Sequence, residues 1–144
     1  MPSKPFLLLS DQIPSDDDLP ILPVNVITGF LGAGKTTLLN RLMKPRLDAG
    51  KKLLCVQFEA GEDDLDWNEN LTTVSILPGE LKQDSGKVLW NLYAMMVKQE
   101  FDEVWVEWNG MQPIQKLFEI FPSHPTEDVG AVSDLCRLSH ILFI

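Results

Sequence analysis

One stretch of this chain decides its fold, and it consists of Val24-Asn25-Val26-Ile27-Thr28-Gly29-Phe30-Leu31-Gly32-Ala33-Gly34-Lys35-Thr36-Thr37. Its first five residues are mostly β-branched and lie between Pro23 and Gly29, which predicts a short buried strand over 24–28. The residues from 29 to 36 match the pattern G-x-x-x-x-G-K-[ST] in full. Apolar residues at helical spacing follow, at Leu38, Leu39, Leu42 and Met43. The stretch therefore predicts a phosphate-binding loop between a strand and a helix.

The residue types in this motif suit the chemistry of a bound nucleotide. Glycines at 29, 32 and 34 let successive N–H groups point into one concavity, and the helix that opens at Lys35 adds its positive dipole end. The Lys35 ammonium is predicted to contact the β- and γ-phosphates, Thr36 to bind Mg²⁺ and Thr37 to contact the α-phosphate. The predicted cofactor-binding residues are Gly29, Phe30, Leu31, Gly32, Ala33, Gly34, Lys35, Thr36 and Thr37.

A site of this kind also needs an acid on a neighbouring strand to hold Mg²⁺. Glu107 closes the apolar run Val104-Trp105-Val106 and is the best candidate, so the predicted metal residues are Thr36 and Glu107. Gly110 follows shortly after and is expected to let the backbone approach the γ-phosphate.

Six acids lie between residues 59 and 69, with no basic residue from 57 to 71. Most of them are expected to form a solvated acidic loop. Glu59 and Glu62 are kept as candidates, because they follow directly on the second predicted strand, where switch loops lie in related NTPases. The predicted catalytic residues are Lys35, Glu59 and Glu107.

The rest of the chain alternates strand and helix patterns. Strands are predicted over 53–58, 73–77, 104–107 and 140–144, and helices from 35 to Pro45, over 86–99, from Pro113 and near 130–138. Gly50 is expected to end the first helix region, and 122–128 to be a loop. This alternation predicts an α/β fold with a mostly parallel sheet and helices on both faces, typical of a P-loop NTPase.

Composition limits the other possibilities. The 144 residues carry a formal charge of −9, which argues against a nucleic-acid partner, and no apolar run or signal peptide indicates a membrane partner or secretion. Two distant cysteines in apolar surroundings are typical of reduced thiols in a cytoplasmic protein. Residues 1–22, rich in proline, are predicted to be a flexible leader and 23–144 the domain. Because the chain stops inside an apolar run, we expect the domain to continue beyond residue 144.

Beyond the bare motif, residues 23–42 resemble, nearly residue for residue, the opening of the CobW family. These are P-loop GTPases linked to metal delivery and related to the nickel chaperones of urease and hydrogenase maturation. Phe58-Glu59-Ala60-Gly61-Glu62 is similar to the family's Asn-Glu-x-Gly-Glu segment, and Glu107-Trp108-Asn109-Gly110 to its Glu-Thr-Ser-Gly segment. The resemblance implies binding and hydrolysis of GTP with Mg²⁺.

The chain also departs from the family pattern. Gly79-Glu80-Leu81-Lys82-Gln83 stands where metal-chaperone members carry Gly-Cys-x-Cys-Cys, Phe58 replaces Asn, and Trp108-Asn109 replace Thr-Ser. The family's guanine-reading Asn-Lys-x-Asp motif is expected beyond Ile144. The resemblance thus supports nucleotide binding more firmly than metal delivery.

Two functions stay open at this point. The first is an Mg²⁺-dependent domain that binds and hydrolyses a nucleoside triphosphate, GTP or ATP, with a protein client or a homodimer as partner. The alternative is a nucleotide-binding interaction module with little or no hydrolysis, which the replaced Thr-Ser pair favours. An ATP-using kinase would need basic residues in a lid, and this acidic sequence does not show them.

Overall fold

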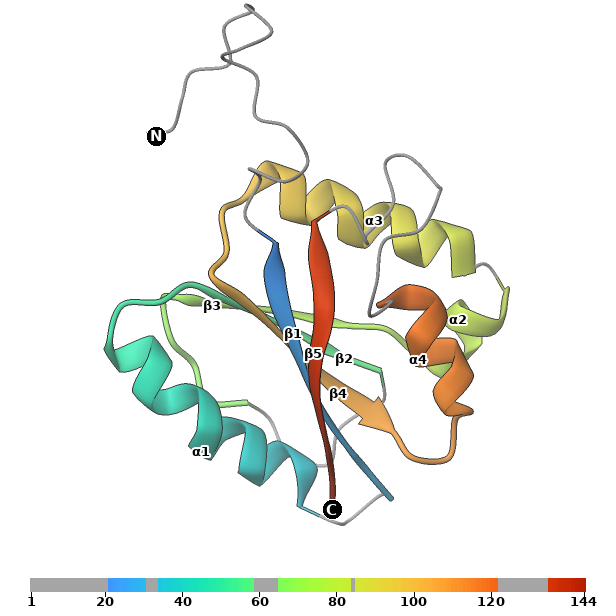
Figure 1. Cartoon of the computed structure of the whole chain (residues 1–144), viewed down its shortest axis with the longest axis horizontal. Helices are drawn as coiled ribbons and strands as arrows, with labels where there is room; N and C mark the ends of the chain where they lie inside the picture. Colours follow the sequence, from blue (N-terminus) through green and yellow to red (C-terminus); the bar gives the residue numbers. More distant parts are fainter. Residues whose placement is uncertain (1–20, 31–33, 59–64, 84, 122–134) are drawn as a thin grey trace, which may run out of the picture.

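The computed structural model describes residues 21–30, 34–58, 65–83, 85–121 and 135–144. Strands and helices are interspersed along the chain (Figure 1), with two strands in succession at β2 and β3 and two helices in succession at α2 and α3. They are β1 (Leu22–Gly29), α1 (Lys35–Asp48), β2 (Leu53–Gln57), β3 (Leu71–Ser75), α2 (Pro78–Gln83), α3 (Ser85–Lys98), β4 (Glu103–Asn109), α4 (Ile114–Ile120) and β5 (Cys136–Phe143).

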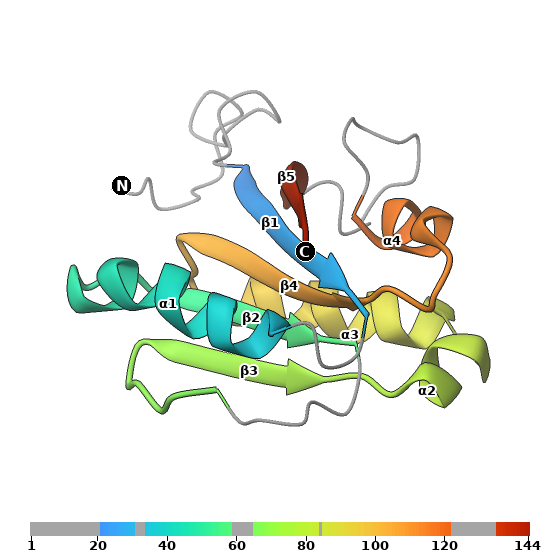
Figure 2. The ribbon, with the colours of Figure 1, turned by 90° about the horizontal axis from the view of Figure 1, so that it is seen from below.

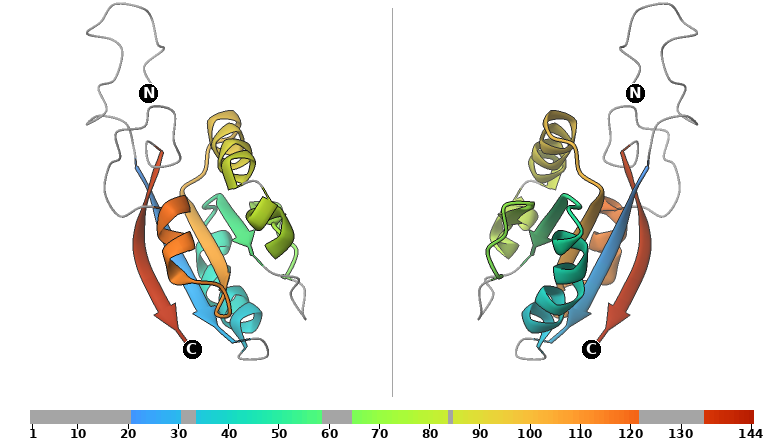
Figure 3. Two further views of the ribbon diagram at one scale, coloured as in Figure 1. Left: turned by 90° about the vertical axis from the view of Figure 1, so that its right-hand side faces the viewer. Right: turned by 90° about the vertical axis from the view of Figure 1, so that its left-hand side faces the viewer.

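The five strands form one parallel sheet in the order β3-β2-β4-β1-β5. Figure 2 shows this order from one edge to the other, and Figure 3 shows β5 at the outer edge beside β1. Because all strands are parallel, their carboxyl ends meet at one edge of the sheet, which is where open α/β sheets bind ligands. The predicted α/β class with a parallel sheet is confirmed.

Each face of the sheet has its own core. Helix α1 packs Leu39, Met43 and Leu47 against Ile27, Leu53, Cys55 and Trp105. Helices α3 and α4 pack on the other face, against residues that include Val26, Val56, Val106 and Trp108. Side chains that alternate along β2 and β4 therefore face opposite cores, as the two-residue repeat of a strand requires. The predicted helices on both faces are confirmed.

Most predicted elements exist, and several have shifted ends. The strand expected over 73–77 lies at Leu71–Ser75, and Glu107 lies inside β4, two residues before its end, instead of closing the strand. The short helix α2 was not predicted. Gly50 has a positive φ of 88° and ends the helical region, as expected for a glycine in that position.

One prediction about element type was wrong. The helix expected near 130–138 does not extend over 136–138, because Cys136 begins β5 and pairs with Leu22 of β1. Short apolar patterns fit either state, and pairing with a neighbouring strand decides between them. The loop expected over 122–128 lies outside the described residues.

The first helix was expected to end or kink at Pro45, but it continues to Asp48. Proline removes one helical hydrogen bond and costs about 3 kcal/mol in a helix interior. The residues after it make contacts that offset this cost. Leu47 is buried in the core, and the guanidinium of Arg46 lies 3.0 Å from the Glu103 carboxylate.

Candidate functional site

The phosphate-binding motif lies between β1 and α1, at the carboxyl edge of the sheet. Gly29 is the last residue of β1, and Gly34 caps α1 with a left-handed φ of 90°, a conformation that glycine adopts without strain. Figure 1 shows that α1 begins at the end of the sheet where β1 and β5 end. The predicted site residues Leu31, Gly32 and Ala33 lie outside the described residues.

Lys35 is the first residue of α1 and is buried, with 4% of its surface exposed. Its Nζ donates hydrogen bonds to the backbone oxygens of Gly29 and Phe30, each at 2.9 Å. The ammonium group is thus held across the start of the loop by carbonyl groups, which leaves it where phosphate oxygens can replace them. Phe30 itself is exposed, as is Thr37 at the start of the helix.

Thr36 and Glu107, the two predicted metal residues, are in contact. The Thr36 hydroxyl lies 3.2 Å and 3.1 Å from the two carboxylate oxygens of Glu107. Both side chains are buried, and Glu107 is only 1% exposed. The sheet brings them together because β4 lies next to β1, with Glu107 in register with Ile27. Hydroxyl and carboxylate oxygens are hard donors, so this pair fits Mg²⁺.

A third side chain in this group was not predicted from the sequence. Gln57, the last residue of β2, donates from Nε2 to the carboxylate of Glu107 at 3.0 Å. A polar residue at the carboxyl end of a strand next to β4 is the only signal that could have pointed to it, and that signal needs the strand order. The Glu107 carboxylate is therefore contacted from α1 and from β2.

Gly110 packs against the start of the loop. Its backbone N–H donates to the carbonyl oxygen of Gly29 at 2.9 Å, and a Cβ atom at this position would lie 2.6 Å from that oxygen. The expected role of this glycine was a close approach to phosphate. The structure shows a close approach to the backbone of Gly29, which by itself requires glycine, and the approach to phosphate stays a prediction.

Aromatic residues fill the opposite face of the sheet behind Glu107. The rings of Phe58 and Trp108 lie 4.9 Å apart between centroids, and Phe121 lies edge-on to Phe58 at 6.5 Å. All three side chains are buried, and Nε1 of Trp108 has no hydrogen-bond partner in the structure as described. Phe58 and Trp108 are two of the departures from the CobW pattern, and they pack against each other.

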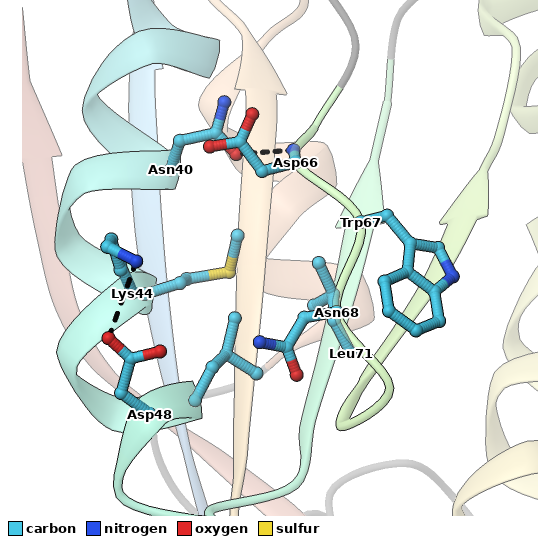
Figure 4. A pocket seen from close by; sticks show the side chains of 9 residues that line it. Asn40, Lys44, Asp48, Asp66, Trp67, Asn68 and Leu71 are labelled. Carbon is cyan, nitrogen blue, oxygen red and sulfur yellow. Dashed lines mark hydrogen bonds and ion pairs between the residues drawn. The ribbon is translucent and has the colours of Figure 1, made fainter.

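A small cavity of about 60 Å³ lies between α1 and residues 66–71 (Figure 4). Asn40 of α1 accepts a hydrogen bond from the backbone N–H of Asp66 at 2.9 Å, which holds this segment against the helix. The cavity has room for a few water molecules and not for a nucleotide. A wider depression of about 380 Å³ is lined by residues that include Lys52 and Phe101. It lies at the amino ends of the strands, away from the phosphate-binding motif.

The remaining candidates are placed as follows. Glu59 and Glu62 lie outside the described residues. Cys55 of β2 packs in the core on the α1 face and Cys136 of β5 in the core on the other face, so the sheet separates the two thiols. No group of three or more His, Cys, Asp or Glu side chains in the described ranges could hold a metal ion. No helix in that part of the chain is long and apolar enough to cross a membrane.

A parallel five-stranded sheet, a helix that opens with Gly34-Lys35-Thr36 and an acid on the adjacent strand define the class of P-loop nucleotide-binding proteins. The profile of the CobW/HypB/UreG nucleotide-binding domain matches residues 23–136. The chain therefore belongs to this family, and the domain is a nucleotide-binding domain. No solved structure matches the chain.

Proposed function

We propose that this domain binds GTP together with Mg²⁺ and hydrolyses the γ-phosphate. The observation that carries the proposal is the contact between the Thr36 hydroxyl and both oxygens of Glu107, next to the lysine of the phosphate-binding motif. These groups come from α1 and β4, and each is buried. Polar groups that are buried at one place stabilise the charge that develops in phosphoryl transfer more strongly than the same groups do in water.

In this proposal each residue has one role. Lys35 exchanges its carbonyl contacts for the β- and γ-phosphate oxygens, and Thr36 and Glu107 would hold Mg²⁺. The metal, when bound, neutralises charge on the phosphate oxygens. The loop from Gly29 to Thr37 binds the phosphates, and Glu59 orients the attacking water. The proposed partner that responds to the nucleotide is a protein client or a second copy of the chain, in the cytoplasm.

Replacement of Lys35 tests the proposal. Lys35→Ala removes the cation placed at the phosphates, and a charge-assisted contact of this kind is worth roughly 1.5–3 kcal/mol. We expect the affinity for GTP, measured by calorimetry in the presence of Mg²⁺, to fall by about one to two orders of magnitude. ATP titrated under the same conditions reports the base preference. Unchanged affinity in a folded Lys35→Ala variant would reject the assignment.

A second function is favoured by the aromatic cluster behind Glu107. Phe58 and Trp108 stand where the CobW pattern has Asn and Thr, and their rings pack 4.9 Å apart at the ends of β2 and β4. This favours an interaction module that binds nucleotide with little hydrolysis. Single-turnover release of phosphate separates the two functions, because the module would retain intact GTP over many hours.

A further inference from the structure

Gln57 lies beside the proposed metal pair and has no role in the function described so far. It is in register with Glu107 on the neighbouring strand, and the backbone N–H of the next residue, Phe58, donates to the Glu107 carbonyl at 2.9 Å. The two backbones are therefore fixed relative to each other. Strand alternation puts both side chains on the face that α1 covers, since Cys55 and Trp105 pack there.

The side-chain contact is specific in its chemistry. Gln57 Nε2 donates to Oε1 of Glu107 at 3.0 Å, and the same oxygen lies 3.2 Å from the Thr36 hydroxyl. A buried carboxylate needs hydrogen-bond donors, because burial removes it from water. An amide supplies a donor without adding positive charge, so it orients the carboxylate and does not compete with a cation for it.

We infer that Gln57 is a positioning residue, which holds the Glu107 carboxylate against Thr36 and so sets the affinity of the nucleotide complex for Mg²⁺. The inference rests on the proposed function, because it assigns the metal to Thr36 and Glu107. Groups that orient a metal-binding carboxylate typically change metal affinity by about 10–100-fold when they are removed. Gln57 is separate from the phosphate-binding motif, so binding of nucleotide without metal does not depend on it.

The test compares Gln57→Met, which keeps the length of the side chain and removes the donor, with the wild-type chain. GTP affinity is measured by calorimetry in EDTA and across a titration of Mg²⁺. We expect the Mg²⁺ concentration for half-maximal effect to rise by about tenfold, whereas GTP affinity in EDTA stays within about twofold. Gln57→Asn keeps an amide on a shorter side chain. We expect its Mg²⁺ concentration for half-maximal effect to lie between the values for the wild type and for Gln57→Met.

Gln99→Met is the matched control, because Gln99 is exposed at the end of α3 and the same chemical change there is expected to alter neither measurement. Thermal unfolding of each variant shows that it is folded. An Mg²⁺ requirement of both Gln57 variants within twofold of the wild type overturns the inference, and so does an equal loss of GTP affinity in EDTA, which indicates a structural role. A wild-type chain that binds neither GTP nor ATP in either buffer overturns the proposed function as well.

Discussion

Two glycine residues meet where β1 and β4 end, and their contact fixes the start of the phosphate-binding loop. The carbonyl oxygen of Gly29 accepts the N–H of Gly110, and the two backbones are too close for a side chain at position 110. The Gly29 carbonyl also accepts a hydrogen bond from Lys35. The Gly29 carbonyl group thus binds both the residue that follows β4 and the lysine of the motif.

Gly110→Ala is expected to disturb this contact. The new Cβ would lie 2.6 Å from the Gly29 oxygen and 2.7 Å from its carbonyl carbon, so backbone must move. Overpacking of this kind costs about 1–3 kcal/mol of unfolding free energy. We expect this loss in urea unfolding, together with weaker binding of GTP in calorimetry.

Gly79→Ala is the matched control for this prediction. Gly79 lies in α2, and a Cβ there has no atom within 4 Å among the described residues. Alanine also favours a helix more than glycine does, so we expect equal or slightly higher stability and unchanged GTP binding. Equal unfolding free energies and equal GTP affinities of the two variants would show that the Gly29–Gly110 contact contributes to neither.

Helix α1 runs from the phosphate-binding loop to the end of the sheet where β4 begins. Glu103, at the start of β4, accepts from the indole N–H of Trp105 at 2.9 Å and lies 3.1 Å from Nζ of Lys51 and 3.0 Å from Nε of Arg46. The guanidinium of Arg46 also lies 5.1 Å from the centre of the Trp105 ring. These contacts hold the last turn of α1 against β4, which explains why the helix continues past Pro45.

Pro45→Ala is expected to stabilise the protein. The substitution restores a backbone N–H inside the helix, and the gain is partly offset because alanine leaves the unfolded chain more freedom than proline does. We expect the free energy of unfolding, measured in urea, to rise by about 1–2 kcal/mol.

Pro113→Ala provides the comparison. Pro113 caps α4 with a φ of −58° and lies before the first helical residue, where its missing N–H costs no helical hydrogen bond. We expect no gain in stability there. A Pro45→Ala variant that is no more stable than Pro113→Ala would contradict the account of α1.

The whole molecule keeps two thiols in separate cores, one on each face of the sheet. Burial raises the pKa of the Cys136 thiol from 9.0 to about 12. Burial, together with the nearby Glu107 carboxylate, raises the pKa of Cys55 as well. The folded protein therefore keeps both thiols protonated in a pH range where the unfolded chain ionises them.

The sign of the effect on stability follows from proton counting. Above about pH 9 the unfolded chain binds fewer protons than the folded protein, so the free energy of unfolding falls as pH rises toward 12. Below pH 9 the thiols make their full contribution to the free energy of unfolding. We expect the urea midpoint to decrease between about pH 9 and 10.5.

Cys136→Ala tests the contribution of this thiol directly. The variant loses some stability at pH 8, because burial of the side chain is reduced, but its urea midpoint should depend less on pH above 9. A variant with the same pH dependence as the wild type would show that the Cys136 thiol does not contribute.

Sequence alone determined the class of fold and most of the binding motif. Residues 24–36 combine a β-branched run, a complete glycine-rich motif and the start of an apolar helical repeat, and these signals are local in the chain. Glu107 was also predicted, because it follows an apolar run of the kind that forms a buried strand. The spacing of apolar residues, which is also a local signal, predicted helices at α1, α3 and α4.

Only the tertiary structure decided which side chains meet. Gln57 and Glu107 are 50 residues apart in the chain, and they come into contact because β2 lies beside β4. Strand pairing likewise made Cys136 part of β5. The ion pair between Arg46 and Glu103 stabilises the part of α1 that follows Pro45. In each case the deciding contact joins residues that are distant in sequence, and local patterns carry no information about such contacts.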